Sequence, residues 1–206
     1  MFKDRQVAAG KLSEKLKNSS NSEEFDAIIA VTFSGLQTAK KVSEELELPM
    51  YTVISSKLHV PGRSELEFGS VAYDGTIWLD DAMVDEFMID RDFIREMASE
   101  TREQLRKELK THNVATERDI KSKNILIVTD GIASGMQTSA SLGTCMKNGA
   151  DSITIATPFI SEHAYDNISE LADSVLYLKK PRFVASIKDG YASEFGGTIS
   201  KLSRQI

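Results

Sequence analysis

The stretch "ILIVTDGIASGMQT", residues Ile125 to Thr138, begins as an apolar run and changes abruptly into glycines, hydroxyls and a single carboxylate. The run Ile125 to Val128 is continuously apolar rather than alternating, which is typical of a strand that is buried on both faces. Such strands belong to parallel sheets covered by helices. In those sheets, ligands bind where a strand ends and a loop leads into a helix. Asp130 stands at such a position, so this stretch is the first candidate for a functional site.

Apolar runs of the same kind recur along the chain, with helical patterns between them. The predicted strands are Asp26 to Val31, Met50 to Ile54, Ile125 to Val128, Ile153 to Thr157 and Val175 to Leu178. The predicted helices between them are Leu36 to Leu46, about Gln137 to Lys147, and about Glu162 to Leu171. Alternating strands and helices predict an α/β fold, with a mostly parallel sheet that carries helices on both faces.

Two segments interrupt this alternation. The Asp74-Gly75 pair lies between β-forming residues and predicts a β-hairpin with a type I′ turn, inserted after the second strand and projecting from the sheet. A long helix is predicted from Asp90 to about Lys110, because Asp90 is a suitable N-cap and Ile89 and Ile94 have the spacing of a hydrophobic staple.

The composition is that of an ordinary globular protein, and its 206 residues are predicted to form a single domain, residues 1–206. The net charge of −6 disfavours broad binding to nucleic acid or to an anionic membrane. Cys145 is the only cysteine, which excludes an internal disulfide and favours a cytoplasmic setting. The sequence has neither the apolar core of a signal peptide nor the roughly 20 apolar residues of a membrane helix.

The loop after Val128 combines the features of a phosphate-binding turn. Gly131 and Gly135 allow the backbone to curl around an anion, the next helix offers free N–H groups, and Ser134 and Thr138 add hydroxyl donors. The glycine spacing matches neither the ATP-type loop nor GxGxxG. A carboxylate would repel the phosphate itself, so sugar hydroxyls are better partners for Asp130, and together these features describe a ribose 5-phosphate site. The loop alone leaves an alternative open, in which Asp130 and Ser134 only cap the helix.

The same residues resemble the signature of the type I phosphoribosyltransferases: an aliphatic run, two acids, a short loop with Thr/Ser-Gly, and a further Thr or Ser. The likeness covers almost the whole chain and is nearest to an uncharacterised bacterial and archaeal subgroup. Further matching stretches are "MFKDRQVAAG" (1–10), "SSKLHVPGRSELEFGSVAYDG" (55–75) and "RFVASIKDGYASEF" (182–195).

The resemblance implies the fold of that family, with a small hood built here from the N-terminal and C-terminal segments. It also implies transfer of ribose 5-phosphate from 5-phosphoribosyl 1-pyrophosphate (PRPP) to a nucleobase-like acceptor, with Mg²⁺ bound through PRPP near Asp130 rather than by direct protein ligands. Asp130 and Lys57 are the expected catalytic residues. The expected substrate-binding residues are Ser34, Gly35, Lys57, Thr129, Asp130, Gly131, Ile132, Ala133, Ser134, Gly135, Met136, Gln137 and Thr138.

The chain departs from the family pattern at three places. Thr129 stands where the family has the first of two adjacent acids, "TFSG" (32–35) replaces Pro-Arg-Gly-Gly, and Ser56-Lys57 replaces Arg-Lys. Lys57 is therefore the remaining cation expected to face pyrophosphate, with Arg63 and Arg102 as candidates to help it. The phosphate loop is intact, but the catalytic end of the predicted site is reduced.

Three hypotheses about function follow from this pattern. The leading one is a cytoplasmic phosphoribosyltransferase, expected to form a homodimer and to bind PRPP and a small-molecule acceptor. The second is a non-catalytic module of the same fold that binds PRPP, a nucleotide or a sugar phosphate. The third is a catalytically empty scaffold that acts through oligomerisation. A flat ring for stacking the acceptor base is expected from Phe183, Tyr191 or Phe195.

Overall fold

A computed structural model describes residues 1–19, 25–111, 116 and 120–192 of the chain. Its main sheet has five parallel strands, and the five predicted strands are confirmed. Their order across the sheet is β2 (Met50–Thr52), β1 (Ala27–Ala30), β6 (Asn124–Val128), β7 (Ser152–Phe159) and β8 (Ser174–Lys179).

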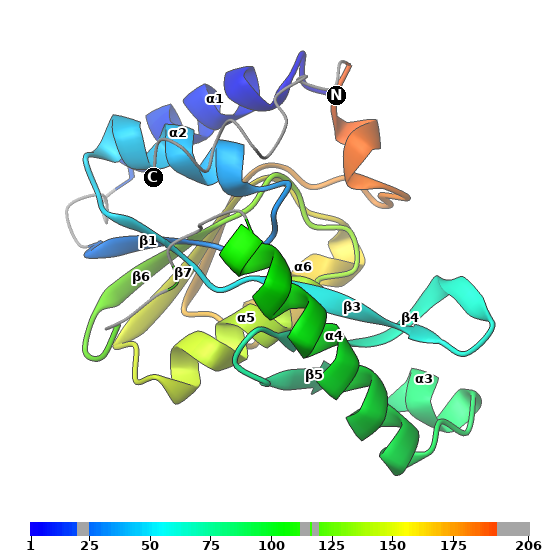
Figure 1. Ribbon diagram of the computed structural model, residues 1–206. Helices are drawn as coiled ribbons and strands as arrows, with labels where there is room; N and C mark the ends of the chain where they lie inside the picture. The colour runs from blue at the N-terminus through cyan, green and yellow to red at the C-terminus, as the bar shows by residue number, and fades with distance from the viewer. Residues whose placement is uncertain (20–24, 112–115, 117–119, 193–206) are drawn as a thin grey trace.

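Helices cover both faces of this sheet, as predicted (Figure 1). One face is covered by α1 (Arg5–Lys17) and α2 (Leu36–Leu46), the other by α5 (Met136–Lys147) and α6 (Glu162–Ser169). Successive side chains of a strand point to opposite faces. In β1, for example, Ile28 therefore packs in the cluster that contains α1 and α2, whereas Ile29 packs with α5 and α6.

A second sheet, antiparallel, contains β3 (Ser55–Val60), β4 (Arg63–Ala72) and β5 (Ile77–Leu79). The hairpin predicted around Asp74-Gly75 joins β4 to β5 and lies outside the parallel sheet, as expected, whereas β3 was not predicted as a strand. The predicted type I′ turn is wrong. The Gly75 N–H donates to the Ala72 carbonyl at 2.9 Å, and of these turn residues only Gly75 has a positive φ. The connection is therefore a type I turn followed by a left-handed glycine.

The small sheet is covered by α4 (Arg91–Thr111), and the short helix α3 (Asp81–Glu86) lies between β5 and α4. The predicted start of the long helix is confirmed, since the Asp90 carboxylate accepts the Asp92 N–H at 2.7 Å and both Ile89 and Ile94 are buried. Among the described residues, no helix has the length and apolar character that crossing a membrane requires.

The N-terminal segment pairs with the segment that follows β8. The Phe2 N–H donates to the Gly190 carbonyl at 2.7 Å, and the Ala192 N–H donates to the Phe2 carbonyl at 2.8 Å. Gly190 ends a short 3₁₀ helix, η1 (Ile187–Gly190). This pairing, which includes the bridge between Phe2 and Tyr191, places the segment after β8 beside the start of α1 (Figure 1).

Gly10 lies in the interior of α1, where a built Cβ would meet no other atom within 4 Å. Because glycine costs about 1 kcal/mol relative to alanine in a helix interior, we expect Gly10→Ala to raise the free energy of unfolding by about that amount. For a chain of this size, the melting temperature should rise by about 2–4 °C. A thermal melt measures the effect, and an unchanged or lower melting temperature would show that this part of α1 is packed differently.

Candidate functional site

The candidate site lies where the connections of the main sheet diverge. From β1 the chain passes through α2 to β2, on one side of the sheet, whereas from β6 it passes through α5 to β7, on the other. The carboxyl ends of β1 and β6 therefore form a topological switch point, the usual ligand position in open α/β sheets. The segments that begin there, 31–35 and 129–135, contain most of the predicted site residues.

Asp130 is held by partners from three separate segments. Arg5, from α1, donates from Nε to Oδ2 of the Asp130 carboxylate at 2.8 Å, and the Ser34 hydroxyl donates to Oδ1 at 3.3 Å. The Tyr191 hydroxyl donates to the backbone carbonyl of Asp130, and the Arg5 guanidinium lies over the Tyr191 ring, 4.8 Å from its centroid. The carboxylate is thus charge-paired at one oxygen and more weakly bonded at the other.

Asp130 is 2% exposed, and this burial raises the pKa of its carboxyl group, while the Arg5 guanidinium and the Ser34 hydroxyl oppose the rise. Burial also raises the pKa of Tyr191, and the nearby Asp130 carboxylate adds to that effect. Since Oδ2 of Asp130 is already paired with Arg5, Oδ1 is the oxygen on which a ligand hydroxyl could replace the Ser34 hydroxyl.

Thr129 is buried and its side chain is engaged within the turn. Its Oγ1 accepts the Gly131 N–H at 2.9 Å and lies 3.4 Å from the Thr157 hydroxyl. A Cβ built on Gly35 would lie only 2.9 Å from Thr32 Oγ1, and at an ordinary contact distance of 3.5 Å from the Asp130 backbone nitrogen. The predicted residues Ser34, Gly35, Thr129 and Asp130 therefore do gather at one point.

The loop from Gly131 to Gly135 is fixed on both sides by backbone and hydroxyl contacts. Ile132 is buried, its N–H donates to the Phe159 carbonyl at 2.9 Å and its carbonyl accepts the Ser161 N–H at 3.0 Å, so it fixes the loop rather than offering a contact to a ligand. The Ala133 carbonyl accepts the Ser161 hydroxyl at 2.6 Å. Gly135 has φ 86°, a left-handed conformation that favours glycine, and forms the N-cap of α5 without a side-chain cap.

The first turn of α5 is bound to the small sheet through its carbonyl groups. Ser70, on β4, donates to the Met136 carbonyl at 2.6 Å, and Ser55, on β3, donates to the Gln137 carbonyl at 2.8 Å. The Gln137 side chain donates in return to the Ser55 carbonyl at 2.9 Å, and Thr138 is buried. These contacts leave the N–H side of the helix start as the side suited to an anion.

Lys57 is linked to this loop by the carboxylate of Glu67, the second carboxylate of the site. Glu67, on β4, accepts the Ser134 hydroxyl at 2.8 Å with Oε2 and forms an ion pair with Lys57 through Oε1. The two arginines considered as helpers lie elsewhere: Arg63 stacks over the Phe87 ring at 5.3 Å, and Arg102 lies against the turn at Gly75.

Arg5 and Glu67 are the two charged residues of the site that sequence reasoning missed. Arg5 stands in the N-terminal stretch that carries the family resemblance, which gave a signal that the residue matters but not that it pairs with Asp130. Glu67 also stands in a stretch that carries the resemblance, 55–75, but regular alternation along a strand does not predict the face on which it lies.

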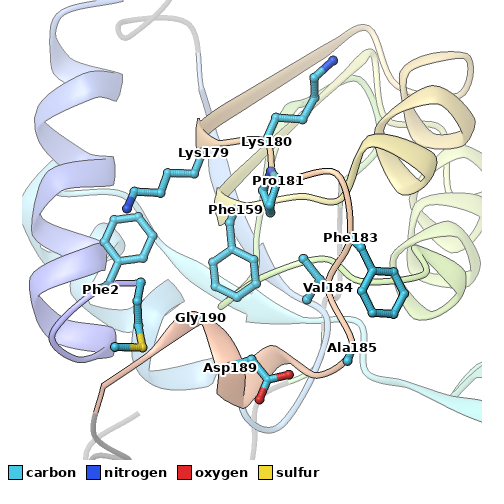
Figure 2. Close-up of a pocket in the computed structure, with 11 residues that line it drawn as sticks. Phe2, Phe159, Lys179, Lys180, Pro181, Phe183, Val184, Ala185, Asp189 and Gly190 are labelled. Atoms are coloured by element: carbon cyan, nitrogen blue, oxygen red, sulfur yellow. The ribbon is translucent and has the colours of Figure 1, made fainter.

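A cavity of about 630 Å³ lies next to the loop, between the N-terminal segment and the segment after β8. Figure 2 shows the Phe2, Phe159 and Phe183 rings around it, with Lys179 extending toward Phe2 and Asp189 at its lower edge. The Phe159 ring lines this cavity and also packs against the loop, since a Cβ built on Gly131 or on Gly190 would lie 2.4 Å or 2.1 Å from the ring.

The candidate stacking rings differ in accessibility. Phe183 lines the cavity and is 77% exposed, so its face is available to a ligand. Tyr191 is buried in the cluster with Phe2 and Phe159, with its hydroxyl on the Asp130 carbonyl, and therefore serves the core. Phe195 lies outside the described residues.

Comparison with known proteins agrees with the motif. A Mycobacterium tuberculosis protein named "Putative phosphoribosyl transferase", found in two strains, is 26% identical over 194 residues, which is 93% of this chain and 43% of that protein. The chain resembles the phosphoribosyltransferases. It spans less than half the length of this curated relative, and no protein-family model matches it.

Solved structures support the fold. The crystal structure of TT1426 from Thermus thermophilus has a TM-score of 0.78 at 24% identity, and the match covers 98% of this chain and 96% of that one. A hypothetical protein from Neisseria gonorrhoeae, solved with bound ppGpp, has a TM-score of 0.52 at 13% identity, covering 100% of this chain and 96% of that one. Both likenesses concern the fold alone, and it is the α/β fold predicted from the sequence.

Proposed function

We propose that the chain binds PRPP at the switch point and transfers its ribose 5-phosphate group to a nucleobase-like acceptor. The observation that carries this proposal is the position of Asp130 and of the glycine-containing turn into α5, Gly131 to Thr138, together at the carboxyl ends of β1 and β6. The 5-phosphate would lie at the start of α5, where N–H groups and the partial positive charge of the helix favour an anion. A ribose hydroxyl would donate to Oδ1 of Asp130 in place of Ser34.

The residues present suit a reaction that depends on positioning. The bond from C1 of the ribose to pyrophosphate breaks and its electron pair leaves on pyrophosphate, while an acceptor nitrogen donates its lone pair to C1 and releases its proton to water. Holding the sugar by its phosphate and hydroxyl while the leaving charge develops supplies most of what this step needs. Arg5 would act as a positioning residue, because it fixes the Asp130 carboxylate without occupying Oδ1.

The site does not fit a magnesium ion held by the protein. Within the part of the chain that the structure describes, no three His, Cys, Asp or Glu side chains gather in a way that could hold a metal. Both carboxylates of the site have cationic partners, Asp130 in Arg5 and Glu67 in Lys57. We therefore propose that Mg²⁺, if used, enters already bound to PRPP, and we assign no step of the reaction to it.

The acceptor is proposed to lie in the cavity beside Phe159. We expect Phe183→Ala to weaken acceptor binding about fivefold, because an aromatic stacking contact contributes on the order of 1 kcal/mol. Calorimetry with a panel of bases measures this effect. Met88→Ala removes an exposed apolar side chain near α3, at 88% exposure, and serves as the control. If Phe183→Ala and Met88→Ala bind the acceptor with equal affinity, the acceptor does not stack on Phe183 and lies elsewhere.

A non-catalytic binding module of the same fold is the second candidate. Three observations favour it: Thr129 replaces an acid, Asp130 is charge-paired with Arg5, and Lys57 is charge-paired with Glu67. The Neisseria gonorrhoeae neighbour, solved with bound ppGpp, gives one example of a nucleotide bound on a related fold.

Two measurements test the proposal and separate the candidates. Titration of PRPP and ribose 5-phosphate by calorimetry, with and without Mg²⁺, tests ligand binding. Pyrophosphate release with a panel of bases tests transfer. Binding with release supports the enzyme, and binding without release for any base supports the module. No binding of either sugar phosphate would contradict the enzyme and leave a nucleotide-binding module or the scaffold, which titration with nucleotides then separates.

A further inference from the structure

A β-bulge in the small sheet turns Glu67 toward the candidate site. From Ser55↔Ala72 to Leu58↔Gly69 the pairing of β3 with β4 is regular, but the next pair is His59↔Glu67. Phe68 is therefore an extra residue on β4, and it packs on the side of the sheet that α4 covers. The shift places Glu67 on the same side as Ser70, which bonds to the first turn of α5.

On that side, Glu67 meets the loop that the proposed function assigns to phosphate. Its two carboxylate oxygens are bound by the Ser134 hydroxyl and by Lys57, which lies directly opposite Ser70 on β3. The Glu67 side chain is 19% exposed, so the contact is largely shielded from water. The first turn of α5 contains no acidic residue and Gly135 provides no side-chain cap. Glu67 therefore brings a negative charge, from another element, to the hydroxyl of Ser134, which immediately precedes the N-cap of α5.

We propose that the Glu67 carboxylate is an internal competitor for the anion site at the start of α5. This inference rests on the proposed function, because it assumes that the ligand phosphate also uses Ser134. A phosphate that accepts the Ser134 hydroxyl must displace Oε2 of Glu67, and the displaced carboxylate repels it at short range. Displacement also frees Lys57 from its ion pair, so that its ammonium group becomes available to the incoming anion.

The competitor makes Glu67 a determinant of specificity. An anion that offers only its charge, such as inorganic phosphate, has to replace a carboxylate already held by two donors. A phosphate carried on a sugar gains further contacts, including the one proposed at Asp130, and can displace Glu67 at a lower concentration. The loop therefore selects phosphate esters over free phosphate, and the selection depends on one side chain.

Glutamine at position 67 keeps the shape of the side chain and removes its charge. We expect Glu67→Gln to bind inorganic phosphate about tenfold more tightly than the wild type, because a charge-assisted contact no longer has to be broken. The preference for ribose 5-phosphate over inorganic phosphate should shrink. Glu65→Gln is the matched control, since Glu65 is exposed, lies on the same strand and changes the net charge equally. Its affinities should stay within about twofold of the wild type, as expected for a screened surface charge.

Lys57 gives a second arm to the experiment. In the wild type, Lys57→Met removes both a partner of Glu67 and a cation for the ligand, so the two effects on phosphate affinity oppose each other. In the Glu67→Gln background only the loss of the cation remains, and we expect a decrease of about tenfold. A purely structural role for the ion pair predicts instead that, once Glu67→Gln has broken the pair, Lys57→Met has no further effect on phosphate affinity.

The outcomes separate this inference from the function on which it rests. If Glu67→Gln binds inorganic phosphate and ribose 5-phosphate with the same affinities as the wild type, Glu67 is not a competitor, although the phosphate site itself is supported. If neither protein binds ribose 5-phosphate or PRPP, the phosphate site itself is excluded, and the competitor with it. A structure of the wild type with phosphate decides the matter without any variant: Glu67 must have left Ser134, and phosphate bound at this loop with that contact intact would overturn the inference.

Discussion

Arg5→Met is expected to lower the free energy of unfolding by about 3–5 kcal/mol, because it leaves the buried Asp130 carboxylate without its cation. Methionine keeps most of the length of the side chain, so the loss of charge dominates over the loss of packing. Urea denaturation measures the change. Lys17→Met, on the same helix, breaks an exposed ion pair with Glu45 and should cost less than about 1 kcal/mol.

The deficit of the Arg5 variant should depend on pH in a particular direction. Burial already places the pKa of Asp130 in the folded protein above its value in the unfolded chain, and removal of Arg5 raises this pKa further. A carboxyl group with a raised folded pKa binds its proton more tightly in the folded state, so stability increases as the pH falls through that pKa. The deficit of Arg5→Met should therefore be largest near neutral pH and shrink on acidification.

A second substitution checks the assignment of this effect. Asp130→Asn removes the buried charge and should restore much of the stability of the Arg5→Met variant at neutral pH. A deficit that is independent of pH, or that Asp130→Asn fails to reduce, would show that Arg5 stabilises the fold through packing on Tyr191 rather than through charge.

Thr129→Asp is expected to tighten Mg²⁺-dependent PRPP binding by about tenfold to a hundredfold, the scale of a charge-assisted hydrogen bond. Thr129 replaces the first of the two acids in the family signature, and its hydroxyl brings no negative charge to the site. In the free protein, the added carboxylate would lie buried beside Asp130, which raises the pKa of one of the two acids and lowers stability. A metal arriving on PRPP would supply the missing cation.

Titration of this variant with and without Mg²⁺ separates the two leading hypotheses. Tighter binding and faster pyrophosphate release in the presence of the metal would support an enzyme that works with a reduced site. Weaker PRPP binding even with Mg²⁺ would support a site reshaped for a ligand without that metal, and so the binding module. Thr129→Asn controls for the change in packing, because asparagine has a shape similar to that of aspartate and carries no charge.

The sequence predicted those parts of the molecule that depend on local patterns. Continuous apolar runs located the five parallel strands, and helical spacing located α2 and α4, including Asp90 as the cap of α4. The Asp74-Gly75 pair located the hairpin but not its turn, since the type I′ conformation requires a positive φ at both central residues and Asp74 lacks one. Strand β3 was missed because its sequence, SSKLHV, is not a continuous apolar run, and helix α3 because its six residues are too short for a helical pattern.

The candidate site was predictable only in part, for a similar reason. Asp130, Ser134 and the glycines of the loop lie in one continuous stretch, and strand order then brought Ser34 and Gly35 beside them. The pair of Arg5 with Asp130 joins positions 125 residues apart. The contact of Glu67 with Ser134 depends on a bulge that reverses the usual alternation. Both contacts arise from tertiary packing, so no local pattern could reveal them.

The way Asp130 is held also sets the order in which the site can assemble. Two of its partners, Arg5 and Tyr191, belong to segments that pair with each other through Phe2. These segments lie near opposite ends of the described part of the sequence. Contacts of such large sequence separation close long loops and form late in folding. During synthesis, α1, β1 and β6 can emerge and begin to pack before residue 191 exists. Tyr191, which holds the Asp130 backbone carbonyl and lies under the Arg5 guanidinium, can therefore complete the site only after it has left the ribosome.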